Sequence, residues 1–326
     1  MEKSGTAVND TTNADMGNAD AATSGIAVTD MATSDMAATN PAVTCTTCFH
    51  RCVLKDGQVG FCRARMNRQG IIVPLGYESG MGRLSALALD PIEKKPLARF
   101  MPGSRILSVG GWSCNMRCPF CQNYEISQHT PEVDGNGLTP QELVSKALSL
   151  RGRGNIGVAY TYNEPLVSWE YLRDCAVLVR QVGMKNVIVT NGCISTNVLD
   201  EILPYTDAMN IDLKCFSAGS YRKLGGDLGA VKDAISMCHN YGQAYEHGCI
   251  HIELTTLIVP GFNDSEEEMA EEAAWIASLD RNIPLHLTRF FPRWKMESLP
   301  ATPVETLCRL AELARRELSD VLLGNV

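Results

Sequence analysis

Residues 106–121 read ILSVGGWSCNMRCPFC, a short apolar run followed directly by a loop that carries three cysteines. The run at 106–109 has the length and the residue types of a buried strand. The loop starts with two glycines and ends with the spacing Cys114-x-x-x-Cys118-x-x-Cys121. Loops that follow the strands of a parallel sheet lie at the edge where ligands bind. This stretch therefore predicts a site built from thiols at the end of the first strand.

The alternation of strand and helix continues through the rest of the chain. Five further runs of strand length follow, at 156–160, 186–190, 209–213, 251–259 and 284–290. Helical patterns lie between and after them, at 141–150, 169–182, 197–203, 231–241, 266–279 and 304–318. Two of these helices have good starting signals, at Thr139-Pro140 and at Ser265 with Glu268. Six strands alternating with six helices predict an α/β fold with a parallel sheet. Periodicity leaves open whether that sheet is doubly wound or forms a complete or partial barrel.

Two other regions precede this alternation. Residues 1–44 hold no Trp, Phe, Tyr or Leu, so they have too little apolar surface to offset the entropy lost on ordering. We predict a disordered, low-complexity tail at 1–44, a Cys-rich metal-binding lobe at 45–98 and a core domain at 99–326. The lobe combines short apolar runs with four cysteines, which is typical of a small fold held together by metal.

Composition excludes several classes of function. The chain has 326 residues and a formal net charge of −8, which disfavours a nucleic-acid partner, tRNA modification included. No apolar run reaches the roughly 18 residues of a membrane span. The first residues lack the basic and apolar regions of a secretion signal, so we expect a cytoplasmic protein. In that reducing compartment clustered cysteines indicate metal chemistry more often than disulfides.

The three thiolates of the first loop match the needs of a [4Fe–4S] cube, whose usual ligands are four cysteines. The missing fourth thiolate leaves one iron open to a chelating small molecule. Zinc is the alternative, but structural zinc sites close with four ligands. His129 lies eight residues past Cys121, outside the usual ligand spacing. The loop therefore favours an iron–sulfur cluster over zinc.

Four more thiols lie within 18 residues of one another, at Cys45, Cys48, Cys52 and Cys62. A set of four is a closed shell, typical of structural zinc or of a second iron–sulfur cluster. We predict a second metal site there, with a structural or an electron-relay role, over unligated thiols. The spacing does not choose the metal, and His50 offers a substitute ligand.

On these residues the sequence resembles the radical S-adenosylmethionine (SAM) enzymes, whose signature is Cys-x-x-x-Cys-x-aromatic-Cys, with Phe120 as the aromatic residue. The stretches 85–97, 102–104 and 118–128 are similar to the AmmeMemoRadiSam-system radical SAM proteins, relatives of the pyruvate formate-lyase activating enzyme. The resemblance covers residues 45–326. It implies a partial (β/α)6 TIM-like barrel that binds a [4Fe–4S] cluster and SAM.

The resemblance also implies a reaction. One-electron reduction cleaves SAM to methionine and a 5′-deoxyadenosyl radical, which abstracts a hydrogen atom, so the enzyme is an oxidoreductase. The narrower expectation is activation of a glycyl-radical enzyme, in which a glycine of a partner protein loses the hydrogen. An electron donor such as flavodoxin or ferredoxin is then a further partner. The alternatives are radical modification of a small molecule, a lipid or another protein side chain and, from a different class, a non-catalytic zinc-binding scaffold.

Residues after the second strand match a SAM-binding segment of related enzymes. Asn163-Glu164-Pro165 takes the position of a Gly-Gly-Glu-Pro segment that binds the SAM amino group, with Tyr162 and Asn163 in place of the glycines. A carboxylate suits this role because it accepts charge-assisted hydrogen bonds from an ammonium. A surface acid is the alternative for Glu164. Phe120 is expected to pack near the adenine, near the cube or within the core.

The third and fourth strands end in two more matching segments. Thr190-Asn191-Gly192 matches a segment that approaches the SAM ribose or methionine, and the glycine permits close backbone approach. Asp212 and Lys214 match an Asp-Leu-Lys segment and alternate onto the same face of their strand. An ion pair inside the barrel is the alternative for these two residues.

Overall fold

The computed structural model describes residues 41–77, 79–129, 137–244 and 250–326. Residues 1–40 of the predicted tail lie outside these ranges, so the disorder expected there stays a prediction. Val43–Thr44 form strand β1, which pairs with β2 (Val53–Leu54) on either side of the first cysteines. None of the helices in the described ranges is long and apolar enough to cross a lipid bilayer.

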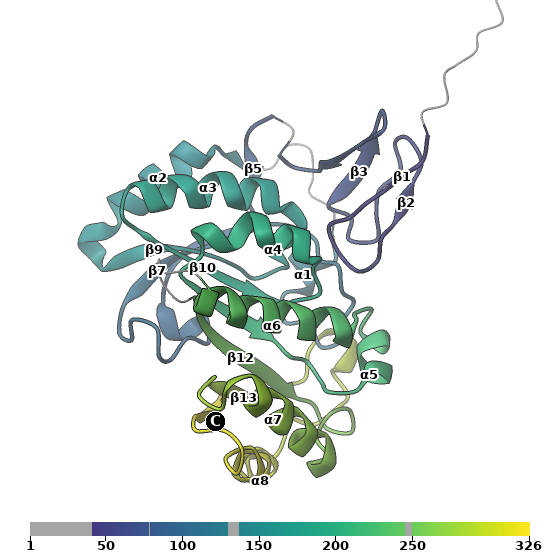
Figure 1. The fold of residues 1–326 in the computed structure, drawn as a ribbon, viewed down its shortest axis with the longest axis vertical. Helices are drawn as coiled ribbons and strands as arrows, with labels where there is room; N and C mark the ends of the chain where they lie inside the picture. The colour runs from purple at the N-terminus through teal and green to yellow at the C-terminus, as the bar shows by residue number, and fades with distance from the viewer. Residues whose placement is uncertain (1–40, 78, 130–136, 245–249) are drawn as a thin grey trace, which may run out of the picture. The chain divides into compact units, whose positions relative to one another are not determined.

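An eight-stranded sheet carries the core (Figure 1). Its strand order is β14-β13-β12-β11-β10-β9-β7-β6. One edge strand, β6 (Ala86–Pro91), runs antiparallel to its neighbour. The other seven are parallel: β7 (Arg105–Gly110), β9 (Asn155–Thr161), β10 (Lys185–Thr190), β11 (Ala208–Asp212), β12 (His251–Ile258), β13 (Leu285–Arg289) and β14 (Val321–Gly324).

The strand order decides between the two architectures that periodicity left open. From β7 to β14 each strand of the sheet lies beside the next one along the chain, and the order never reverses. A doubly wound sheet needs such a reversal, whereas crossovers of one hand in a constant direction put all the helices on one face. Among the described strands, β6 and β14 end the sheet without pairing with each other. The sheet is therefore a partial barrel, as predicted.

The helices lie where the periodicity predicts them, and Figure 1 shows them in chain order along the sheet. The longer ones are α2 (Pro140–Ser149), α3 (Trp169–Gln181), α4 (Thr196–Ile202), α6 (Leu228–Ala244), α7 (Glu266–Asp280) and α8 (Val304–Ala314). Two short helices, α1 (Tyr124–Ser127) and α5 (Ala218–Lys223), follow β7 and β11. Thr139 and Ser265 both accept the hydrogen bond expected of a residue that caps a helix.

Two strands of the sheet are not among the six predicted. β6 falls within the predicted Cys-rich lobe, ends in a proline and is partly exposed along its length. β14 is four residues long and becomes a strand through its pairing with β13. The lobe also contains a hairpin of β3 (Arg65–Arg68) and β4 (Ile71–Pro74), and β5 (Gly82–Arg83) pairs with β8 (Gly137–Leu138). The domain boundary between 98 and 99 stays a prediction.

Residues 92–98, which we call the plug, fill the amino-terminal end of the barrel interior. Ile92 and Leu97 are fully buried and pack with four strand residues, Ile106, Ala159, Val187 and Ala208. Residues two positions further along two of these strands, Thr161 on β9 and Val189 on β10, line a cavity of about 840 Å³. Because strand side chains alternate between faces, both sets point inward. The interior is thus closed below by the plug and hollow above it.

Candidate functional site

The cavity lies where the parallel strands end, and residues from successive strands line it. It contains ten of the eleven residues that the sequence assigned to the cluster and SAM, namely Cys114, Cys118, Phe120, Cys121, Asn163, Glu164, Thr190, Asn191, Asp212 and Lys214. Gly192 is the exception. The residues predicted from four separate chain segments therefore line one cavity.

The thiol loop presents its three cysteines to this cavity. Cys118 is buried, whereas Cys114 and Cys121 are partly exposed. Hydrogen-bonding groups lie near two of the sulfurs: Met116 N and Asn191 Nδ2 lie 3.4 and 3.5 Å from Cys114 Sγ, and Ser127 Oγ lies 3.2 Å from Cys121 Sγ. Burial raises the pKa of Cys114, as do Glu164 and the other two thiols, and burial raises the pKa of Cys118 to about 11. A metal must displace the protons of these thiols in order to bind.

The fit of an iron–sulfur cluster depends on how the thiols are grouped. In the described ranges no three or more His, Cys, Asp and Glu side chains form a group that could hold a single metal ion. A cube differs from a single ion, because each of its thiolates binds a different iron. Among the described residues, the cysteines that line the cavity are the three of this loop, and hydrogen bonds to sulfur are a usual feature of such clusters. The donor set therefore fits a cube with one open iron.

Asn115 and Arg117 hold the backbone of the thiol loop in place. Asn115 is fully buried; its Nδ2 donates to the carbonyl oxygen of Cys193 at 2.7 Å, and its Oδ1 accepts from Asn191 Nδ2 at 2.8 Å. Arg117 Nη1 donates to the carbonyl oxygen of Cys114 at 2.8 Å. Neither residue was predicted from the sequence. Both could have been identified from the sequence, because they are polar residues between the ligand cysteines and have no part in binding the metal itself.

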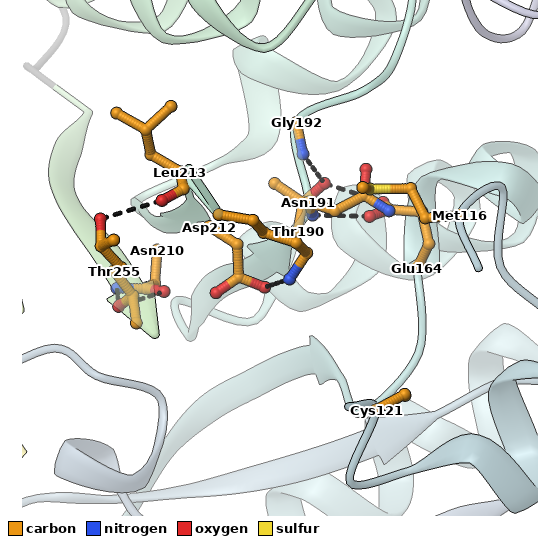
Figure 2. A network of polar contacts seen from close by, with 12 residues as sticks. Met116, Cys121, Glu164, Thr190, Asn191, Gly192, Asn210, Asp212, Leu213 and Thr255 are labelled. Carbon is orange, nitrogen blue, oxygen red and sulfur yellow. Dashed lines mark hydrogen bonds and ion pairs between the residues drawn. The ribbon is translucent and has the colours of Figure 1, made fainter. Parts of the chain in front are cut away.

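Glu164 joins the ends of the second and third strands (Figure 2). Its Oε1 accepts from Thr190 Oγ1 at 2.8 Å and from Leu166 N at 3.1 Å, and its Oε2 accepts from Asn191 N at 2.7 Å. The residue is 1% exposed, so it is not the surface acid of the alternative interpretation. Burial raises the pKa of Glu164 to about 7, against the lowering effect of these hydrogen bonds.

Gly192 lies behind the cavity wall. Its φ is +68°, a left-handed conformation that glycine adopts without strain. A Cβ atom there would lie 2.9 Å from Ile211 Cγ2. The glycine therefore lets the segment after β10 pass close to β11, and the approach of this segment to SAM stays a prediction.

Asp212 and Lys214 form an ion pair on the cavity wall. Lys214 Nζ lies 2.8 Å from Asp212 Oδ2. Burial alone would lower the pKa of Lys214, but Asp212 and the thiol of Cys118 raise it above its ordinary value. The ammonium is therefore charged and has two further N–H groups.

Asn163 and Phe120 border the thiol loop. Asn163 Nδ2 donates to the carbonyl oxygens of Trp112 and Ser113 at 3.0 and 2.9 Å, so it fixes the residues just before Cys114. Phe120 is buried, and its ring packs edge-on against Phe262 with centroids 6.0 Å apart. Phe120 thus combines core packing with a place on the cavity wall.

Tyr162, Lys95 and Asp90 form a second polar group beside the cavity, which the sequence analysis did not single out. Tyr162 takes the place of a glycine in the related motif and has a left-handed φ of +74°. Its hydroxyl donates to Asp90 Oδ2 at 2.6 Å, and Lys95 Nζ lies 2.9 Å from the same oxygen. Lys95 belongs to the plug, so these contacts tie the cavity wall to its floor. The sequence did contain a signal for this group, because Tyr162 stands where the related motif has a glycine.

The four cysteines of the lobe lie close to one another. Cys45, Cys48 and Cys62 are buried, and Cys52 is partly exposed. Burial, together with the other three thiols, raises the pKa of Cys48 to about 12. His50 Nε2 lies 2.9 Å from the carbonyl oxygen of Asn115 in the thiol loop, and the role of His50 as a substitute ligand stays a prediction.

Comparison with known proteins identifies a matching family and related sequences. The family model of the radical SAM superfamily matches residues 113–273. An uncharacterized protein of Methanocaldococcus jannaschii is 39% identical over 289 residues, which is 87% of this chain and 81% of that protein. The pyruvate formate-lyase-activating enzyme of Clostridium pasteurianum is 28% identical over 186 residues, 56% of this chain and 73% of that enzyme.

A solved structure shares the fold. Streptococcus suis SuiB bound to S-adenosylmethionine superimposes with a TM-score of 0.50 at 13% sequence identity. The match covers 65% of this chain and 47% of that chain. The likeness concerns the arrangement of strands and helices.

Proposed function

The chain belongs to the radical SAM superfamily, and from that premise we propose that it is a SAM-cleaving enzyme whose [4Fe–4S] cluster is held by Cys114, Cys118 and Cys121. When bound, such a cluster supplies the electron that divides SAM into methionine and a 5′-deoxyadenosyl radical, which abstracts a hydrogen atom from the substrate. One observation carries the proposal: three thiols and the polar ends of β9, β10 and β11 line a single cavity.

Two charged residues of the cavity have capacity left for SAM. A carboxylate oxygen accepts about two hydrogen bonds, and Glu164 Oε2 accepts one, from Asn191 N, so one position remains for an ammonium. Lys214 uses one N–H group on Asp212 and keeps two for a carboxylate. We assign these residues to the amino and carboxylate groups of the methionine part of SAM. Asn163 and Thr190 orient the segments that present them.

We propose that the substrate hydrogen belongs to a glycine of a partner enzyme, as in glycyl-radical-enzyme activation. Support comes from the similarity to the activating enzyme of Clostridium pasteurianum, which spans 73% of that enzyme. The electron would come from a flavodoxin or ferredoxin. A small molecule, a lipid or another side chain as the substrate is the outcome that would replace this assignment.

We further propose a second metal at Cys45, Cys48, Cys52 and Cys62. Three of these thiols are buried together, and their mutual effect on pKa supports a shared site. Binding would draw in the thiols, which do not form a single-ion site as they are. Metal analysis of a Cys45→Ala variant against the wild type decides between zinc, iron and no metal.

The test of the main proposal is anaerobic reconstitution with iron and sulfide, followed by dithionite and SAM, with 5′-deoxyadenosine measured by mass spectrometry. Product should form with the wild type and vanish with Cys118→Ala, because that thiolate holds an iron. Cys308→Ala, which removes an exposed thiol on α8, is the matched control and should keep full activity. A colourless zinc protein, or cleavage that survives Cys118→Ala, would overturn the proposal.

The substrate class has its own test. A partner glycyl-radical enzyme carrying α-deuterated glycine should transfer deuterium to 5′-deoxyadenosine and give a glycyl radical signal by electron paramagnetic resonance. Cleavage of SAM without deuterium transfer from any such partner would reject the activase assignment while leaving the cleavage reaction intact.

A further inference from the structure

A stack of side chains joins the Cys-rich lobe to the thiol loop. The ring of Phe61 lies 4.1 Å from the ring of His50 and 4.2 Å from the guanidinium carbon of Arg117. His50 Nε2 lies 2.9 Å from the Asn115 carbonyl oxygen, and Arg117 donates to the carbonyl oxygens of Cys114 and Phe61. Unbroken contacts therefore run from Phe61, which is 40% exposed, to the backbone beside the first cluster cysteine.

Cationic residues lie on the segments next to Phe61. Arg63 is exposed and donates to the carbonyl oxygen of Gln128, just after α1. Helix α5 ends with exposed Arg222 and Lys223, and the next two residues reach the stack: the Leu224 carbonyl accepts from Arg117 N, and a Cβ on Gly225 would touch Phe61. Together with Arg51, exposed beside His50, we call this set the Phe61 face: Arg51, Phe61, Arg63, Arg117, Arg222 and Lys223.

The charge of this face is opposite to that of the whole protein. Residues 41–77 hold five Arg and Lys residues against one Asp, whereas the chain carries a net charge of −8. Among the described residues of α1, α5 and the turn after α5, the exposed carboxylates are Glu125 and Asp227, fewer than the cations of the face. Aromatic residues and arginines are the residue types enriched at the centre of protein interfaces.

We propose that the Phe61 face is the docking surface for an acidic one-electron carrier protein, which reduces the cluster through the stack of Phe61 and His50. The proposal rests on the proposed function. The carrier loses one electron and the cluster gains it, with no bond made or broken. The geometry favours this route because the cavity side of the thiol loop is the side that SAM and substrate occupy. Phe61, His50 and Arg117 do not line the cavity, so the lobe contacts the thiol loop outside it.

Charge complementarity predicts how the carrier binds. Attraction between an acidic carrier and a basic face speeds association and weakens as salt increases, since the screening length is about 10 Å at 0.1 M salt. Reversing one charge of the face should therefore weaken binding most at low salt. Direct chemical reduction by dithionite needs no docking and should not respond.

The experiment uses the reconstituted full-length chain and an acidic flavodoxin as the probe. Calorimetry measures the dissociation constant at about 50 mM and about 200 mM salt, and SAM cleavage is measured with reduced flavodoxin and, separately, with dithionite. The variants are Phe61→Ala, Arg63→Glu and Arg222→Glu. The matched control is Arg153→Glu, an exposed arginine of the 3-10 turn Arg151–Arg153 before β9. Iron content is checked in each variant.

The three face variants should raise the dissociation constant roughly tenfold at low salt and slow flavodoxin-driven cleavage, with dithionite-driven cleavage within about twofold of wild type. Arg153→Glu should bind as the wild type does. Wild-type affinity in all three face variants, equal weakening by Arg153→Glu, or no binding by the wild type would overturn the proposal. If dithionite yields no cleavage in the wild type, the proposed function fails, and the dissociation constants still decide the docking surface.

Discussion

Replacing Glu272 by Gln should stabilise the protein increasingly as the pH rises. Glu272 is 1% exposed on α7, and its Oε1 lies 2.5 Å from Thr256 Oγ1 on β12. Thr256 Oγ1 also lies 2.9 Å from a second acceptor, the carbonyl oxygen of Leu213, and its hydroxyl has only one hydrogen to donate. If Thr256 donates to that carbonyl, the carboxyl group must donate to Thr256 and is protonated. Leu213 separates Asp212 from Lys214, so this buried chain of hydrogen bonds supports the cavity wall from behind.

The magnitude follows from the pKa. Burial raises the pKa of Glu272 from 4.5 to about 8, and Glu268 adds to the increase. Between those values the folded state keeps a proton that the unfolded state has released, so the free energy of unfolding falls as the pH rises. One pKa unit is worth about 1.4 kcal/mol. The amide of Gln donates the same hydrogen bond without titrating, so the advantage of Glu272→Gln should grow by roughly 2 kcal/mol between pH 6 and pH 8.

Urea unfolding of the purified chain at several pH values measures this advantage. Glu271→Gln, one residue away on the exposed side of α7, is the control for charge removal alone and should follow the wild type. An advantage that is constant with pH, or one that Glu271→Gln reproduces, would refute the protonated carboxyl. A variant less stable than the wild type at pH 8 would refute it more directly.

Three further substitutions test other contacts. Glu164→Gln leaves a buried donor such as Asn191 N without an acceptor, and we expect a loss of about 1–3 kcal/mol in the free energy of unfolding by urea titration, smaller if the amide turns away. Gly192→Ala combines a left-handed φ with a Cβ atom 2.9 Å from Ile211 Cγ2, so the urea midpoint should fall by the equivalent of about 1–3 kcal/mol; an unchanged midpoint would contradict the tight packing. Glu253→Gln removes a carboxylate whose pKa is lowered to about 2 by hydrogen bonds that outweigh burial. Its contribution is present above the unfolded pKa and lost in acid, so the variant should lose about 3 kcal/mol at pH 7 and less near pH 3, as thermal unfolding at both values would show.

The parts of the fold that depend on local pattern were predictable. The strand at 106–109 and the helix beginning at Thr139 follow from periodicity and capping, and both are present within a residue or two. β14 was missed because a four-residue strand at a sheet edge depends on its partner rather than on its own pattern. The choice of a barrel over a doubly wound sheet depends on strand order, which local periodicity does not contain.

The functional site, like the fold, was predictable only in part. The cysteine spacing, the carboxyl ends of the strands and the family resemblance predicted ten of the residues that line the cavity. What Glu164 contacts could not be predicted, because Thr190 and Asn191 reach it only after the second and third strands pair. His50 illustrates the same limit: its type suggested a metal ligand, whereas its position 65 residues before Asn115 along the chain gave no sign of their contact.

The plug has a kinetic consequence. With Ile92 and Leu97 filling the amino-terminal end, the interior is a blind well rather than a channel. Reactants that enter a blind well must leave in the reverse order, so the molecule nearest the floor arrives first and departs last. Turnover should therefore follow a compulsory order, and a bound product near the mouth should slow the exchange of everything beneath it.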